Sequence, residues 1–181
     1  MTMKITLCGI KHAGKTSAGK ALAKMLDLPF ADTDDILQDL YNTRHSTSLS
    51  VREIFRTIGS DLFRQLEAEA IRTLAGKQGI FALGGGALSN PYVKAKERKL
   101  LGFLCALNIT NRMAYERIEA EGLPPFLQGK KNPFRTFCES NTERRRLFCQ
   151  FAAASVSAGP TPEDTARKIL NAYEKSKTKD C

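Results

Sequence analysis

Short apolar runs alternate with longer segments of helical periodicity along this chain of 181 residues. Runs of a few apolar residues indicate buried strands, whereas apolar positions that recur every three to four residues predict helices. We expect strands at residues 3–8, 29–31, 79–83, 102–108 and 153–157. Helices are expected at residues 15–26, 33–41, 51–58, 61–75, 91–100, 111–119, 141–152 and 162–175. This alternation favours an α/β fold with a parallel sheet, built as a single domain over residues 1–181.

Two polar stretches lack a clean period. Residues 42–50 are rich in turn-forming residues, and residues 122–133 contain three prolines, Gly129 and the pair Lys130-Lys131. A polar stretch of this length inside a compact domain is commonly functional or disordered. Residues 122–133 are therefore a candidate functional loop.

The composition is that of an ordinary globular domain, with 42% hydrophobic residues. No apolar run approaches the roughly 20 residues that cross a bilayer, so we expect no membrane partner. A strand that begins at residue 3 leaves no room for a signal or transit segment, which favours a cytoplasmic location. The five cysteines are widely spaced and form no C-x-x-C pair, so we expect reduced thiols.

The chain is basic, because its 28 lysines and arginines exceed its 19 acidic residues by nine. Such an excess suits either a nucleic-acid-binding protein or a protein whose pockets take small anions. The basic residues form no long run and do not alternate with aromatic residues. This diffuse pattern favours the second interpretation, with no nucleic-acid partner.

Residues 9–16 match the G-x-x-x-x-G-K-[ST] pattern of a phosphate-binding loop, with a predicted strand before it and a predicted helix after it. Loop amides and the helix N-terminus would bind a polyphosphate, and Lys15 would place its charge on the β- and γ-phosphates. The Thr16 hydroxyl would bind Mg²⁺. In a kinase, residues 122–133 would form a lid that excludes water from the transfer.

Asp32 and Asp34 follow the short apolar run at residues 29–31. A phosphate-binding loop needs an acid near Mg²⁺ and a group that orients the acceptor, and two carboxylates at a strand end can divide those roles. The alternative is a helix N-terminus, where acidic residues interact favourably with the helix dipole. Asp35 fits that alternative well.

Gly84, Gly85 and Gly86 directly follow a predicted strand. Consecutive glycines there allow a ligand to approach the backbone, or simply allow a tight turn, and the tripeptide alone does not distinguish the two. Arg64 and Arg144 lie on predicted helices, where a lone arginine is more typically solvated. Neither histidine has a serine or cysteine partner at a useful spacing, so we assign neither to catalysis.

Taken together, these motifs resemble the shikimate kinases over nearly the whole chain. The matching positions are residues 9–17, 30–36, 54–55, 59, 63–64, 67, 83–87, 143–144, 147–148 and 162–163. The resemblance implies transfer of the ATP γ-phosphoryl group to the 3-hydroxyl of shikimate, a step of aromatic amino-acid biosynthesis. It also implies a three-layer fold like that of nucleoside-monophosphate kinases, with a five-stranded parallel sheet flanked by helices. A substrate-binding region near residues 32–64, a mobile lid near residues 120–138 and a monomeric state are expected.

The resemblance also implies site residues by position. Lys15 and Asp34 are the expected catalytic residues, with Asp34 as the base or the orienting carboxylate. The residues expected to bind ATP are His12, Ala13, Gly14, Lys15, Thr16, Ser17 and Arg117, the last of these against the adenine. Those expected to bind shikimate are Asp34, Arg64, Gly84, Gly85, Gly86 and Arg144, with the two arginines on its carboxylate. Thr16 and Asp32 are the expected metal residues, for Mg²⁺.

Two departures from the family pattern fall near the phosphates. His12 stands where the family commonly has glycine. The family's lid usually carries Arg-Pro-Leu-Leu, whose arginine would reach the transferring phosphate, but residues 123–127 contain no arginine. Lys130, Lys131 and Arg135 are the candidate replacements, and the sequence does not choose among them.

Two other functions fit parts of the pattern. Another small-molecule kinase, for gluconate or a nucleoside monophosphate, would share Lys15 and Thr16 but would not need the acidic, glycine and arginine motifs in this order. A nucleotide-binding protein with little catalysis would fit the missing lid arginine. A basic RNA-binding protein is a weaker third alternative.

Overall fold

Five parallel strands form one sheet in the order β2-β3-β1-β4-β5 in this computed structural model, which describes residues 3–124 and 127–178. The strands are β1 (Lys4–Cys8), β2 (Phe30–Asp32), β3 (Gly79–Ala82), β4 (Phe103–Asn108) and β5 (Ala154–Ser157). All four neighbouring pairs are parallel, which confirms the predicted sheet. The apolar run of β3 is buried at every position and that of β1 at all but Lys4, because both strands are covered on both faces.

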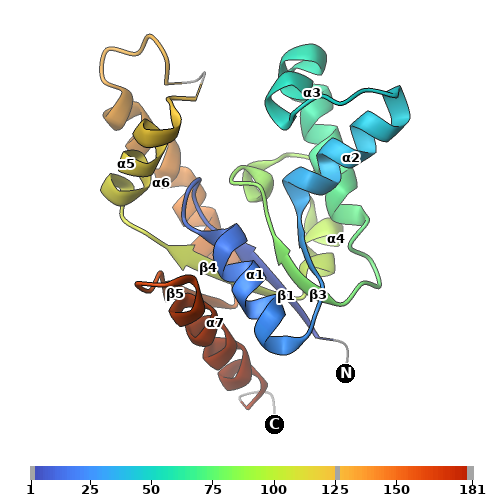
Figure 1. Cartoon of the computed structure of the whole chain (residues 1–181), viewed down its shortest axis with the longest axis vertical. Coiled ribbons are helices and arrows are strands. Elements are labelled where there is room, and N and C mark those ends of the chain that lie inside the picture. Colours follow the sequence, from blue (N-terminus) through green and yellow to red (C-terminus); the bar gives the residue numbers. More distant parts are fainter. Residues whose placement is uncertain (1–2, 125–126, 179–181) are drawn as a thin grey trace.

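Helices cover both faces of the sheet and make the fold three-layered (Figure 1). The helices are α1 (Lys15–Leu26), α2 (Thr33–His45), α3 (Val51–Arg72), α4 (Ala95–Arg98), α5 (Asn111–Glu121), α6 (Pro133–Phe151) and α7 (Pro162–Lys177), with short 3₁₀ turns η1 (Ala87–Ser89) and η2 (Lys99–Leu101). In Figure 1, α1 and α7 lie side by side in front of the sheet, whereas α4 and the lower part of α6 lie behind it. The pair α2 and α3 and the pair α5 and α6 project on opposite sides of the loop that joins β1 to α1 (Figure 1).

The two helices expected at 51–58 and 61–75 both form within α3 and are separated by a kink, because Gly59 has a non-helical φ of 76° and ψ of 175°. The helix boundaries differ from the prediction in two other places. α6 begins at Pro133 rather than at residue 141, because Asn132 caps its first turn and proline is well suited to the first helical position. Only α4 and η2 form within residues 91–100. The start of α6 was not predicted because the prolines near it are as typical of a loop as of the first turn of a helix.

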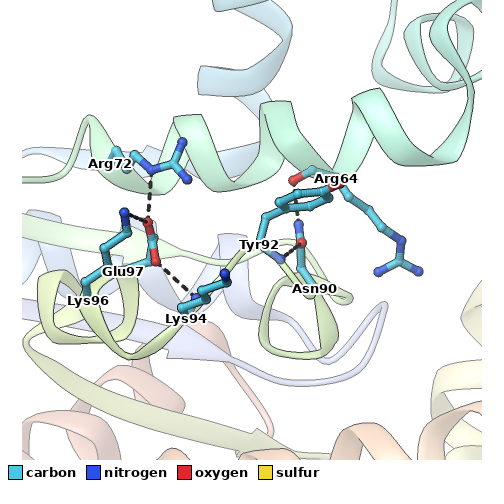
Figure 2. Close-up of polar contacts among 7 residues, drawn as sticks. All are labelled: Arg64, Arg72, Asn90, Tyr92, Lys94, Lys96 and Glu97. Carbon is cyan, nitrogen blue, oxygen red and sulfur yellow. Dashed lines mark hydrogen bonds and ion pairs between the residues drawn. The ribbon is translucent and has the colours of Figure 1, made fainter.

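A buried glutamate joins α3 to the segment that leads into β4 (Figure 2). Glu97 is only 1% exposed, and its Oε1 accepts a hydrogen bond from Arg72 Nε of α3 at 3.0 Å. Its Oε2 accepts a second from the Lys94 amide at 3.1 Å. Burial alone would raise the pKa of Glu97, but these hydrogen bonds outweigh it and the pKa lies below its ordinary value. The carboxylate therefore stays charged and keeps the far end of α3 against the core.

Gly102 offers a test of the packing at the start of β4. It has a φ of 63°, and a Cβ atom there would lie 2.7 Å from the Lys4 carbonyl oxygen. We expect Gly102→Ala to lower the free energy of unfolding by at least about 2 kcal/mol, because conformational strain and a backbone clash add. Gly76 is the matched control, with a φ of 69° and no atom within 4 Å of a Cβ. Gly76→Ala should cost only about 1 kcal/mol, and equal urea midpoints for the two variants would contradict the clash.

Candidate active site

The phosphate-binding loop joins β1 to α1 at the carboxyl edge of the sheet. Gly14, with a φ of 87°, is the N-cap of α1 and makes no side-chain cap, so the first amides of the helix stay available to an anion. The Lys15 ammonium donates to the carbonyl oxygens of Gly9 and Ile10, both at 3.1 Å. Burial lowers the pKa of Lys15, while Asp34 and Asp32 act to raise it. The loop thus has the local geometry that its sequence motif predicts.

Thr16 and Asp32 meet across the base of this loop. The Thr16 hydroxyl donates to Oδ2 of Asp32 at 2.8 Å, which joins the first turn of α1 to the end of β2. The other carboxylate oxygen of Asp32 accepts from the Asp34 amide at 3.1 Å and so caps α2. Asp32 therefore caps α2, as expected for an acidic residue at a helix start, and also contacts Thr16, the other residue predicted to bind the metal.

Asp34 lies directly against the triple glycine. A Cβ atom at Gly84 would be 2.5 Å from Oδ1 of Asp34, and the Gly84 amide donates to the Thr33 hydroxyl at 3.0 Å. Gly84 is thus required for the close approach of a carboxylate, which the tripeptide alone did not reveal. Burial, reinforced by the neighbouring charge of Asp32, raises the pKa of Asp34 to about 6.

A cleft of about 590 Å³ runs along this edge of the sheet. It is lined by Lys11, His12, Gly14, Lys15, Thr16, Ser17, Asp32, Asp34, Leu83, Gly84, Gly85, Gly86, Arg117, Glu121 and Arg144. Every predicted site residue is among them except Ala13 and Arg64. Ala13 is 1% exposed and faces a second hollow beside the loop, so only its backbone is available to a phosphate.

Arg144 of α6 lines the acceptor end of the cleft, and Glu67 of α3 acts on it through its charge. Burial and the charge of Asp34 raise the pKa of Glu67 to about 7, against the opposing charges of Arg64 and Arg144. Asn90 donates through Nδ2 to Glu67 Oε2 at 3.1 Å and to the Arg64 carbonyl oxygen at 2.7 Å. In Figure 2 the Arg64 guanidinium points away from Asn90, and Arg64 does not line the cleft. Its charge nevertheless acts on both Glu67 and Arg144.

The nucleotide end of the cleft is built by Arg117 and His12. Arg117 Nη1 donates to the His12 carbonyl oxygen at 2.8 Å, and Arg117 also lines the second hollow, of about 210 Å³, with Pro160. His12 has a φ of 59°, a left-handed conformation that glycine adopts with less strain. Its Nδ1 lies 3.3 Å from Oε1 of Glu121, the last residue of α5. Burial lowers the pKa of His12, and Glu121 opposes the shift.

Three residues that line the cleft were not predicted as site residues, namely Lys11, Leu83 and Glu121. Glu67, which acts on Arg144 without lining the cleft, was also not predicted, although its spacing of three residues from Arg64 places both on one face of a helix. Lys11 lies inside the phosphate motif at a position that the motif leaves unspecified. Glu121 could not be found from the sequence, because its contact with His12 joins positions 109 residues apart.

The expected lid cations lie away from the cleft. Lys130 and Lys131 are exposed, and Arg135 donates through Nε to Glu139 at 2.8 Å within α6. None of the three lines the cleft. Residues 133–138 of the expected lid belong to α6, while Pro125 and Phe126 lie outside the described residues.

A phosphate loop, a hydroxyl–carboxylate pair and a cationic acceptor cleft on a five-stranded parallel sheet define a P-loop kinase of small molecules. A family model described as shikimate kinase matches residues 11–174. This chain therefore belongs to the shikimate kinase family, whose members phosphorylate shikimate with ATP.

Individual relatives agree with the family match. A shikimate kinase from Chlamydia pneumoniae is 38% identical over 153 residues, which cover 82% of this chain and 84% of that protein. The solved structure of a shikimate kinase from Acinetobacter baumannii in complex with shikimate superposes with a TM-score of 0.81 at 25% identity, over 97% of this chain and 96% of that one. A gluconokinase from Sinorhizobium meliloti 1021 has a TM-score of 0.60 at 17% identity, over 96% of this chain and 93% of that one, which shows a shared fold alone.

No helix within the described ranges 3–124 and 127–178 is long and apolar enough to span a bilayer.

The raised pKa of Asp34 predicts a pH-dependent cost to stability. Its pKa rises from 3.8 to about 6 on folding, so the folded state binds the proton more tightly and the free energy of unfolding falls as the pH rises from about 4 to about 6. We expect Asp34→Asn to raise the free energy of unfolding at pH 8 by up to about 3 kcal/mol, with the gain declining between pH 6 and pH 4. Urea denaturation of both proteins across this range measures the difference. A gain that does not change with pH would contradict this origin.

Proposed function

We propose that this chain transfers the γ-phosphoryl group of ATP to the 3-hydroxyl of shikimate, with the residue roles given below. The supporting observation is the position of Asp34. Its carboxylate lies in one cleft with the phosphate-binding residues Lys15 and Thr16 and with the acceptor-end residue Arg144. A hydroxyl bound between these two ends would have the γ-phosphate on one side and a carboxylate within reach.

Mg²⁺ is the expected metal, and the donor set fits it. Thr16 and Asp32 present a hydroxyl and a carboxylate oxygen 2.8 Å apart, the oxygen ligands that Mg²⁺ prefers. Among the described residues, no group of three or more histidine, cysteine, aspartate or glutamate side chains is placed to hold a metal ion. Such a site suits a metal that takes most of its ligands from phosphate oxygens and water. When bound, Mg²⁺ supplies charge neutralisation on the β- and γ-phosphates.

Asp34 acts as the general base or as the group that orients the acceptor. The bond from the acceptor oxygen to the γ-phosphorus forms as the bond from that phosphorus to the β,γ-bridging oxygen breaks, and the hydroxyl proton passes to the carboxylate. A pKa near 6 leaves Asp34 ionised at neutral pH and more basic than an exposed aspartate. The ammonium of Lys15 and the loop amides bind the phosphates and are fixed before the reaction.

Arg144 holds the carboxylate of shikimate, with Arg64 as its second partner. Burial lowers the pKa of Arg144, whereas the charge of Glu67 acts to raise it. The negative charge of a bound ligand would likewise stabilise the half-buried guanidinium. A guanidinium fork fixes the orientation of a carboxylate as well as its position, which places one hydroxyl of the ring toward ATP. Gly85 and Gly86 present backbone without side chains to the same ligand.

The remaining assignments follow the same scheme. His12, Ala13, Gly14, Ser17 and Arg117 would contact ATP, the first four through the loop and Arg117 at the adenine. Residues near 32–64 would form the acceptor-binding region and residues near 120–138 the lid. We expect a cytoplasmic monomer without nucleic-acid partners.

ADP release by the purified chain with ATP, Mg²⁺ and shikimate tests the reaction. We expect release that depends on shikimate, with gluconate and a blank without acceptor both at background. Asp34→Asn should lower turnover by about 10²- to 10⁴-fold with ATP affinity retained, since the base is removed and the phosphate loop is left intact. Gluconate-dependent release would favour the other kinase class. ATP binding without turnover on any acceptor would indicate a nucleotide-binding protein instead.

Arg144→Ala tests the acceptor end alone. Loss of a charge-assisted hydrogen bond to a carboxylate costs about 1.5–3 kcal/mol, so we expect the KM for shikimate to rise roughly 10- to 100-fold. The KM for ATP should stay within about twofold, because Lys15 and Arg117 remain. Arg145→Ala is the control, since its side chain bonds Ile109 and Asn111 outside the cleft. An unchanged KM for shikimate in Arg144→Ala would contradict this role.

A further inference from the structure

One cation of the cleft, Lys11, has no role in the function proposed above. Among the described residues, the lysines and arginines that line the cleft are Lys11, Lys15, Arg117 and Arg144. Lys15 donates to two loop carbonyls, Arg117 to the His12 carbonyl, and Arg144 interacts with Glu67 at the acceptor end. No described residue accepts a hydrogen bond from the Lys11 ammonium or forms an ion pair with it, and its side chain is exposed. A flexible, strongly hydrated ammonium of this kind remains available to an anionic ligand.

Lys11 lies where the nucleotide and acceptor ends of the cleft meet. A Cβ atom at Gly85 would be 3.5 Å from the Lys11 amide nitrogen, so the phosphate loop faces the glycine turn at this residue. The charge of Lys11 also reaches the Asp34 carboxyl. Burial and Asp32 raise the pKa of Asp34, and Lys15 and Lys11 oppose them. A positive charge at this position is close to the carboxylate that receives the acceptor proton.

Among residues 3–124 and 127–178, no lysine or arginine other than Lys11, Lys15, Arg117 and Arg144 lines the cleft. Lys130, Lys131 and Arg135 lie outside it, and Arg135 is paired with Glu139. At the positions where the family's lid carries its arginine motif, the described residues Leu123, Pro124 and Leu127 have no charge. In the transition state of phosphoryl transfer, negative charge is spread over the equatorial oxygens of the transferring group, and a cation beside them accelerates the reaction.

We propose that Lys11 is a catalytic residue that neutralises the transferring phosphoryl group, in the role that an arginine of the lid would otherwise fill. The inference rests on the proposed function and adds a residue to it. While the acceptor oxygen binds the γ-phosphorus and the β,γ-bridging oxygen departs with the electron pair, the Lys11 ammonium contacts the equatorial oxygens and keeps its own protons. The hydroxyl proton still passes to Asp34.

Because the cation comes from the phosphate loop, it is in place before any lid closes. Lys11 belongs to the same loop as the backbone amides that bind the phosphates, so its distance to them changes little with the position of residues 122–132. The contribution of Lys11 should therefore be to turnover, with little effect on the binding of either substrate in the ground state.

Lys11→Met, Lys11→Arg and Lys24→Met test this assignment. Methionine keeps most of the length of lysine without its charge, arginine restores the charge, and Lys24 is an exposed lysine on α1 away from the cleft. We expect Lys11→Met to lower kcat by about 10²- to 10³-fold, with both KM values within about threefold of wild type. Lys11→Arg should recover at least a tenth of the wild-type kcat, and Lys24→Met should match wild type. Thermal melts confirm that each variant is folded.

Binding of ADP with aluminium fluoride and shikimate gives a second readout that needs no turnover. Aluminium fluoride mimics the transferring phosphoryl group, so wild type should bind ADP more tightly in its presence, by at least about tenfold in calorimetry. Lys11→Met should lose most of that gain and bind ADP alone as wild type does. Equal gains in the two proteins, or an unchanged kcat, would overturn the assignment.

The alternatives give different outcomes in the same experiments. A drop in kcat in Lys130→Met/Lys131→Met or in Arg135→Met, with Lys11→Met near wild type, would assign the cation to the lid and overturn this inference. Weaker ADP binding by Lys11→Met with an unchanged kcat would make Lys11 a ground-state contact only and would also overturn it. Absence of shikimate-dependent turnover in the wild type would overturn the proposed function itself, and this inference with it.

Discussion

The parallel pairing of β2, β3 and β1 is the constraint on which the site depends. It brings the carboxyl ends of these strands, at Asp32, Ala82 and Cys8, to one edge of the sheet although they are far apart in the sequence. The hydrogen bond from Thr16 to Asp32 and the contact of Asp34 with Gly84 both follow from this register. A shift of β2 along β3 by one residue would turn its carboxylate away from α1, because successive side chains of a strand point to opposite faces.

The carboxylates in and beside the cleft differ from Lys11 in how far they are exposed to solvent. The acidic groups with the most strongly raised pKa values, Asp34 at about 6 and Glu67 at about 7, are half-buried near cations, whereas Lys11, the cation without a described partner, is exposed. Burial makes each carboxylate a better proton acceptor, and the neighbouring cations keep the cost tolerable. The net charge of +9 is thus partly explained by a cleft that takes anions at both ends.

Much of this arrangement could be predicted from the sequence, because its motifs follow strand ends. The sheet, the phosphate loop, Asp34 and the triple glycine were recognisable from local patterns. The start of α6 was not, since Pro133 fits a loop as well as a first helical turn. Contacts such as His12 with Glu121 depend on where α5 ends in space, which no local pattern encodes. Arg64, which was predicted as a site residue, does not line the cleft, and its charge acts on Glu67 and Arg144.

Asn90 has a mechanical consequence for the acceptor end. Its side-chain amide donates to the Arg64 carbonyl oxygen (Figure 2) and to the Glu67 carboxylate. Its Oδ1 accepts from the Tyr92 amide within its own segment. The first two bonds join α3 to the segment that continues from the glycine turn. The two cannot slide past one another unless buried hydrogen bonds break. If α3 moves toward bound ATP, the glycine turn therefore moves with it. Binding of the acceptor and narrowing of the cleft then occur in the same movement.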